Sequence, residues 1–210
     1  MKTRRLFSLF LAIIMCFITT IPAFADSRAI NSDITEVSIE TIDSMTNAQR
    51  NAFISQCAAE NSGRNRLSDI EKLRLCWYAA AKIMENRFPC ASELVQCSVF
   101  GTDYTETDGR FSTAIRKSSD YKAWRTTCSD SSMAFSSGDL FYALHKVGIA
   151  VVSHTSGGGR VCITDTFDFE FETELGSVLV TLINDAAWLS QQVHALTPIK
   201  INISFVDPAI

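Results

Sequence analysis

Apolar and polar residues alternate most regularly between residues 160 and 172. The residues of one side are Val161, Ile163, Asp165, Phe167, Phe169 and Phe171, and those of the other are Cys162, Thr164, Thr166, Asp168, Glu170 and Glu172. A repeat of two residues is typical of a β-strand with one buried and one exposed face. Asp165 is a carboxylate within the apolar row, where an unpartnered charge is costly.

Apolar residues at helical spacing predict helices on both sides of this strand. Thr46 and Gln49 form a capping box at the start of the first long helix, because each side chain can bond the backbone of the other. The expected helices cover approximately residues 46–60, 68–87, 92–101, 136–147 and 178–196. A short helix around residues 39–45 is an alternative to an irregular arm. Residues 102–132 are rich in polar and charged side chains, and we expect a long loop or irregular segment there. A helical turn at residues 121–124 is an alternative within it, because Tyr121 and Trp124 need burial.

A second strand at residues 149–154 and a glycine-rich turn precede the alternating stretch, which predicts a hairpin over residues 149–172. Residues 199–205 alternate again and predict a C-terminal strand beside that hairpin. The expected fold class is α+β, with a helical N-terminal half packed with this small antiparallel sheet. We expect one domain over residues 26–210, with a helical part at about 46–132 and a helix–hairpin–helix–strand part at about 135–206.

The first 25 residues have the features of a cleavable signal peptide of the bacterial type. Lys2, Arg4 and Arg5 precede an apolar stretch, and the small residues Ala23 and Ala25 frame a cleavage site after Ala25. The alternative is a membrane anchor, but the apolar stretch is short for a bilayer span. We therefore expect a secreted protein with no membrane span after cleavage.

The charge of the chain argues against a nucleic-acid partner. The 210 residues include 19 basic and 23 acidic side chains, and loss of the signal peptide removes three cations and no anion. The mature chain then has a net charge of about −7, which gives no attraction to phosphate backbones. The partner is unknown from sequence; a cell-envelope component or another protein fits the expected export.

Six cysteines remain after cleavage, and an even number in an exported chain permits disulfides. Cys90 and Cys97 flank a short helical segment and are the expected pair. Cys57 and Cys76 lie in helical apolar patterns, where a free buried cysteine is ordinary. The sequence has no C-x-x-C motif, and its histidines are not spaced as metal ligands, so we expect neither a metal site nor a cofactor.

Asp165 has two interpretations, since a carboxylate on a buried face must be bonded, paired or protonated. It is either a structural anchor that accepts backbone hydrogen bonds or an acid–base group. Asp168 points to the opposite face of a regular strand, so a carboxylate pair would need a bulge between them. His145, near the end of the 136–147 helix, is the third candidate catalytic residue.

Two stretches together resemble a group of bacterial exported and toxin-like modules. These are residues 137–145, read as Ser-Gly-Asp-Leu-Phe-Tyr-Ala-Leu-His, and residues 161–169, read as Val-Cys-Ile-Thr-Asp-Thr-Phe-Asp-Phe. The group carries an Asp-Leu-x-x-Ala-Leu helix, a hairpin and an Asp-x-Tyr-Asp-Phe strand end. The likeness covers about residues 135–206.

A more remote likeness is to the catalytic module of colicin M-type bacteriocins, which cleave the lipid-linked peptidoglycan precursor. Its signature is Asp-x-Tyr-Asp-x-Asn-x-x-x-His-Arg. Asp165 and Asp168 match it, whereas Phe167 replaces the tyrosine, Glu170 the asparagine, and Glu174 with Leu175 the His-Arg pair. The resemblance implies a shared scaffold, and the replaced residues include the acid–base group and the phosphate-side charge.

Two functional hypotheses follow. The first is a non-catalytic structural or binding module at or outside the cell envelope. The second is a toxin-like envelope hydrolase related to the colicin M-type phosphodiesterases, with Asp165 and Asp168 as catalytic groups and His145 as a further partner. The environment of Asp165 separates the two hypotheses, since an anchor is enclosed and bonded to backbone amides, whereas an acid–base group lines an accessible cleft.

Overall fold

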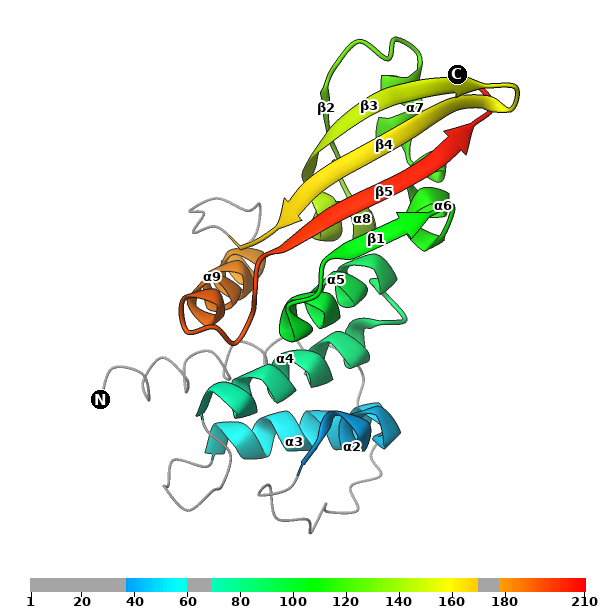
Figure 1. Cartoon of the computed structure of the whole chain (residues 1–210). Coiled ribbons are helices and arrows are strands. Elements are labelled where there is room, and N and C mark those ends of the chain that lie inside the picture. Colours follow the sequence, from blue (N-terminus) through cyan, green and yellow to red (C-terminus); the bar gives the residue numbers. More distant parts are fainter. Residues whose placement is uncertain (1–36, 60–68, 170–177) are drawn as a thin grey trace. The chain divides into compact units, whose positions relative to one another are not determined.

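The computed structural model describes residues 37–59, 69–169 and 178–210. Two compact units divide the chain, and each is described here by itself. The helical unit takes its residues from Met1–Met84 and Phe169–Thr197, and the sheet unit consists of Glu85–Asp168 and Pro198–Ile210. The expected signal peptide and residues 170–172 of the expected strand lie outside the described residues. The elements of both units are labelled in Figure 1.

The helical unit contains α2 (Ile39–Ser44), α3 (Asn47–Ala59), α4 (Asp69–Met84) and α9 (Val178–Gln192). The capping box at the start of α3 is confirmed. The backbone N–H of Thr46 donates to Gln49 Oε1 at 2.8 Å, and the N–H of Gln49 donates to Thr46 Oγ1 at 3.3 Å. These two bonds satisfy donors that the first turn of a helix leaves without intrahelical partners.

Trp77 on α4 connects three segments of the helical unit. Its side chain is buried, and its Nε1 donates to Ser190 Oγ on α9 at 2.9 Å. Its ring also stacks on Phe169, with the ring centroids 6.3 Å apart. Because a buried indole N–H needs an acceptor, the Ser190 hydroxyl fixes where α9 meets α4 within this unit.

The sheet unit is built on five strands in the order β1-β5-β4-β3-β2. Their bounds are β1 (Tyr104–Thr107), β2 (Ser132–Ala134), β3 (Lys146–Thr155), β4 (Gly158–Phe167) and β5 (Ile199–Asp207). Neighbouring strands are antiparallel except β1, which pairs in parallel with β5. The expected hairpin is therefore present as β3 and β4, and the expected C-terminal strand is β5, antiparallel to β4.

Four helices belong to the same unit: α5 (Pro89–Phe100), α6 (Arg110–Lys117), α7 (Ser119–Arg125) and α8 (Gly138–Leu144). Figure 1 shows α6, α7 and α8 beside one face of the sheet. The strand residues that face them are buried: Val147, Ile149, Val161, Ile163, Phe167, Ile199, Ile201, Ile203 and Phe205. This is the apolar row that the alternating sequence predicts, continued across three strands.

Residues 102–132 do not form a long loop, so that prediction was wrong. They contain β1, α6 and α7 and reach the first residue of β2. The carboxylate of Glu106 on β1 accepts hydrogen bonds from the backbone N–H groups of Phe111 and Ser112, at 3.0 and 2.8 Å. Glu106 therefore caps α6 from outside the helix, and the polar composition of the segment reflects short capped helices.

Several element boundaries also differ from the sequence expectations. Helix α5 begins at Pro89 rather than at residue 92, since proline fits the first helical position. Helix α8 ends at Leu144 rather than at residue 147, because Val147 is needed in the buried row of β3. Strand β4 ends at Phe167, so Asp168 and Phe169 do not continue it.

The architecture is thus α+β, with a helical N-terminal region and a five-stranded, mostly antiparallel sheet that includes a C-terminal strand. Within the residues that the structure describes, no helix combines the length and apolar character needed to cross a membrane.

Candidate functional site

Asp165 lies in the apolar row of β4, as the alternating sequence predicts. Its neighbours in that row, Ile163 and Phe167, are buried, and its register partner on β5 is Ile201. Oδ1 accepts a hydrogen bond from the backbone N–H of Thr166 at 2.8 Å. Asp165 itself is only partly buried, so it is neither fully enclosed nor fully open to solvent.

The surroundings of Asp165 favour its neutral form. Burial raises the pKa of the carboxyl to about 7, the hydrogen bond from Thr166 acts against this rise, and the charge of Asp168 adds to it. A carboxyl with a pKa near 7 exchanges protons at neutral pH. This property is compatible with an acid–base group and also with a strained structural position.

Asp168 and His145 lie near the same end of the sheet as Asp165. Asp168 is exposed and follows the last residue of β4. His145 follows α8 with φ 39° and ψ −78°, directly before β3, and the pairing of Gly148 with Thr164 places the start of β3 beside the end of β4.

His145 is exposed, and its ring packs edge-on against Phe141 with the centroids 5.0 Å apart. In the part of the chain that the structure describes, no hydrogen bond or ion pair joins it to Asp165. Asp165 and His145 therefore lie near the same end of the sheet without the direct contact that a catalytic pair of acid and base requires.

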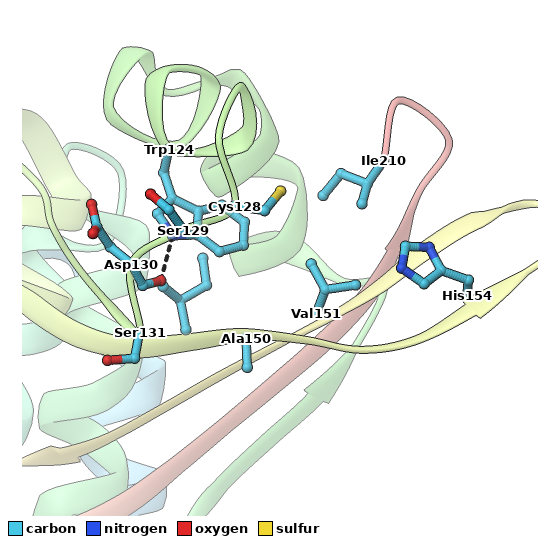
Figure 2. A pocket seen from close by; sticks show the side chains of 10 residues that line it. Trp124, Cys128, Ser129, Asp130, Ser131, Ala150, Val151, His154 and Ile210 are labelled. Atoms are coloured by element: carbon cyan, nitrogen blue, oxygen red, sulfur yellow. Dashed lines mark hydrogen bonds between the residues drawn. The ribbon is translucent and has the colours of Figure 1, made fainter.

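A second feature of the sheet unit is a trough of about 440 Å³ beside β3. Figure 2 shows Trp124 and Cys128 above the strand, Val151 rising from it, and His154 at the far end. The lining residues come from three segments and are Trp124, Cys128, Ser129, Asp130, Ser131, Ile149, Ala150, Val151, His154 and Ile210. Sequence reasoning did not find this trough, because its walls are assembled from segments far apart in the chain.

The wall opposite β3 is held in place by hydrogen bonds within the segment that follows α7. Trp124 is buried, and its Nε1 donates to the backbone oxygen of Asp130 at 2.8 Å. Cys128 has a positive φ of 47°, and its thiol donates to the backbone oxygen of Arg125 at 3.3 Å. The need to bury Trp124 was visible in the sequence, but the partner that buries it was not.

Among the residues that the structure describes, no strand pairs with the edge of β3 that runs along the trough. Pairing with β2 begins at Ser132 with Gly148, and the N–H of Ile149 donates to the backbone oxygen of Ser131 at 3.0 Å. From Ala150 to Thr155, among the described residues, β3 pairs with β4 alone. The register shifts between Val151 and Ser153, and Val152 at this bulge is 56% exposed.

The expected disulfide between Cys90 and Cys97 is not seen, and all six described cysteines are free thiols. Both residues lie on α5, seven positions apart. A helix rises about 10 Å over seven residues, which exceeds the distance between α-carbons that a disulfide can bridge. No cluster of histidine, cysteine and acidic side chains within the described residues could hold a metal ion.

Comparison with known proteins finds no family model, no curated protein and no solved structure that matches this chain. The likeness to exported toxin-like modules and to the colicin M-type catalytic module stays a prediction from the sequence.

Proposed function

We propose that this protein is a non-catalytic binding module at or outside the cell envelope, and that it binds an extended peptide segment of a partner protein. The peptide would add to the free edge of β3 and place a side chain in the trough. The observation that carries the proposal is the continuation of β3 past the end of β2, directly beside the trough.

The chemistry of a strand edge selects the ligand. An edge presents backbone N–H and C=O groups in alternation, and an extended backbone is the partner that satisfies both. Ala150 to Thr155 offer such an edge. The unpaired edge of β3 therefore favours an extended peptide as a ligand over a small polar molecule.

The trough selects the side chain. Trp124 and Ile149, which are both buried, and Val151 give it an apolar surface, while Ser129 and His154 lie at exposed positions of its lining. Alternate residues of an added strand point to the same face of the sheet. One apolar side chain of the peptide would enter the trough, and its neighbours in the peptide would remain in solvent.

The bulge in β3 favours a short peptide over a second copy of the whole chain. A bulge increases the local twist and interrupts regular pairing, which is one way in which proteins prevent edge-to-edge association. The shift between Val151 and Ser153 limits the regular edge to a few residues. A short segment can follow such an edge, whereas two long strands cannot pair across it.

A library of random heptapeptides displayed on phage tests the proposal, with one selected sequence then synthesised and titrated by calorimetry. Val152→Lys places a charge on the free edge and should weaken binding at least about tenfold, because lysine on an edge opposes strand addition. The matched control, Thr105→Lys, adds the same charge to β1, at the other edge of the sheet, and should leave binding unchanged.

The proposal also predicts the pattern of the selected peptides. They should share an apolar residue flanked by variable positions, and their binding should be weakened by Val152→Lys and unchanged by Thr105→Lys. An absence of enrichment over an unrelated protein, or selected peptides that bind Val152→Lys as tightly as the wild type, would overturn the proposal.

A second candidate function is the envelope hydrolase, with Asp165 as the acid–base group. The partly buried position of this carboxyl beside the charge of Asp168 favours it. The test is incubation of the protein with lipid-linked peptidoglycan precursor and chromatography of the released head group. The wild type and Asp130→Asn would release the head group, and a folded Asp165→Asn variant would not. This result would overturn the proposal of a binding module in favour of a hydrolase.

A further inference from the structure

Two buried cysteines face each other within the helical unit. Cys57 lies on α3 and Cys76 on α4, which are consecutive helices in contact with each other. The exposed fractions of their side chains are 1% and 0%. Both thiols are therefore on the faces by which the two helices pack, and neither is in contact with solvent.

The Cys57 thiol lies close enough to Cys76 to affect the pKa of Cys76. A hydrogen bond with the Cys57 thiol, followed by burial, raises the pKa of Cys76 well above its ordinary value. Cys90 and Cys97 differ, since burial and the charges of Asp139 and Glu93 raise their pKa values without a neighbouring thiol. Of Cys76, Cys90 and Cys97, only Cys76 has its pKa raised by another thiol.

We propose that Cys57 and Cys76 are joined by a disulfide when the protein folds under oxidising conditions. The reaction is thiol–disulfide exchange with an oxidised dithiol carrier or glutathione disulfide. One protein thiolate attacks the oxidant's disulfide and forms a mixed disulfide, and the second then attacks the protein sulfur of that mixed disulfide and releases the oxidant's remaining thiol. Two S–H bonds are lost, one S–S bond forms, and the oxidant leaves as two thiols that carry the two electrons and two protons.

The position of the pair gives the cross-link a structural consequence. It would join the end of α3 to the middle of α4 and close a loop of about 20 residues, which restricts the unfolded chain. Exchange needs a thiolate, and a buried thiol of high pKa supplies little of it. The bond should therefore form while the chain folds and form slowly once both cysteines are buried.

Refolding and peptide mapping test this inference. The full chain is refolded from denaturant in a buffer of reduced and oxidised glutathione, denatured again, alkylated without reduction and digested with trypsin. The expected product joins the peptides of residues 51–64 and 75–82, each of which holds one of the two cysteines. Its mass should be lower than the sum of the two peptides by two hydrogen atoms.

Thermal unfolding supplies a second readout. Reduction should lower the Tm of the refolded wild type by about 5–10 °C. Reduction should leave the Tm of Cys57→Ala/Cys76→Ala unchanged, whereas Cys162→Ser should respond as the wild type does.

Full alkylation of Cys57 after oxidative refolding, or its linkage to a cysteine other than Cys76, would overturn the proposal. The peptide mapping uses the wild type, so it tests the disulfide even if the double variant does not fold. The cross-link lies in the helical unit, and its outcome is independent of peptide binding at β3.

Discussion

Two carboxylates of the sheet unit lie in contrasting surroundings. Asp165 is partly buried and accepts one backbone hydrogen bond from Thr166, and its pKa is raised. Asp207 is 2% exposed, and hydrogen bonds from the backbone N–H of Ala209, the Tyr121 hydroxyl and Arg125 outweigh its burial, so its pKa is lowered. The folded state therefore favours a neutral Asp165 and an ionised Asp207, which gives the two residues opposite effects on stability as pH changes.

Asp165→Asn should stabilise the protein at neutral and alkaline pH. The pKa of Asp165 is about 7 in the folded state and about 4 when the chain is unfolded, so its ionisation favours unfolding as pH rises through that interval. We expect the variant to raise the free energy of unfolding by about 1–2 kcal/mol at about pH 8, a value reduced for the partial exposure of the carboxyl. The gain should vanish near pH 3.5, and urea unfolding at the two pH values measures it. An equal effect at both pH values would contradict the assignment.

Asp207→Asn should have the opposite pH dependence. The ionised side chain accepts from Tyr121 Oη at 2.7 Å and lies 3.3 Å from Arg125 Nη1, so the amide loses a buried, charge-assisted contact. We expect a loss of about 2–3 kcal/mol at pH 7, which diminishes as pH falls below about 4 because the wild type is then protonated as well. The control Asp130→Asn changes an exposed side chain and should cost less than about 0.5 kcal/mol.

At the scale of elements, β1 and α6 depend on one side chain. Glu106 on β1 bonds the first turn of α6 and also accepts from Tyr104 Oη at 3.0 Å and from Ser112 Oγ at 2.8 Å. These hydrogen bonds outweigh partial burial and lower the pKa of Glu106. A strand of four residues and a helix of eight are marginal alone, and the shared carboxylate couples them.

Glu106→Gln should destabilise the sheet unit by about 1–2 kcal/mol at pH 7, because an amide oxygen replaces a carboxylate that accepts four hydrogen bonds. Thermal unfolding by circular dichroism measures the change. The matched control is Glu93→Gln, which removes an exposed ion pair with Arg110 at 3.3 Å and should cost less than about 0.5 kcal/mol. Equal losses in the two variants would show that the capping bonds are not the source.

Some parts of this fold can be predicted from the sequence and others cannot. The Thr46–Gln49 capping box and the alternation of residues 199–205 each predicted an element correctly, because both patterns are visible within a few consecutive residues. The loop prediction for residues 102–132 was wrong because composition does not reveal that the side chain of Glu106 caps the helix that follows it. The alternation of apolar and polar residues predicted that Asp165 lies on the buried face of its strand. The trough combines residues 124–131, 149–154 and 210, so no short stretch of sequence predicts it.

At the scale of the whole molecule, the chain passes between the two units three times. The passages lie between Met84 and Glu85, between Asp168 and Phe169, and between Thr197 and Pro198. Helix α9 is thus inserted, in sequence, between the adjacent strands β4 and β5. Phe167, the last residue of β4, pairs with Ile199, the first of β5, so the two ends of the insertion meet at neighbouring positions of the sheet.

The sheet unit should therefore fold without the helical unit. In a shortened chain, residues 85–167 are joined to residues 199–210 through Asn-Gly, which closes β4 and β5 as a two-residue hairpin. All five strands and the helices α5 to α8 remain, and the buried rows of the sheet keep their partners. We expect cooperative thermal unfolding and dispersed amide resonances. The control is Ile203→Asp in the same shortened chain, since Ile203 is 0% exposed and an unpaired charge there should abolish the transition. A shortened chain that lacks cooperative unfolding at all temperatures would show that the sheet depends on α9 or on the N-terminal helices for its stability.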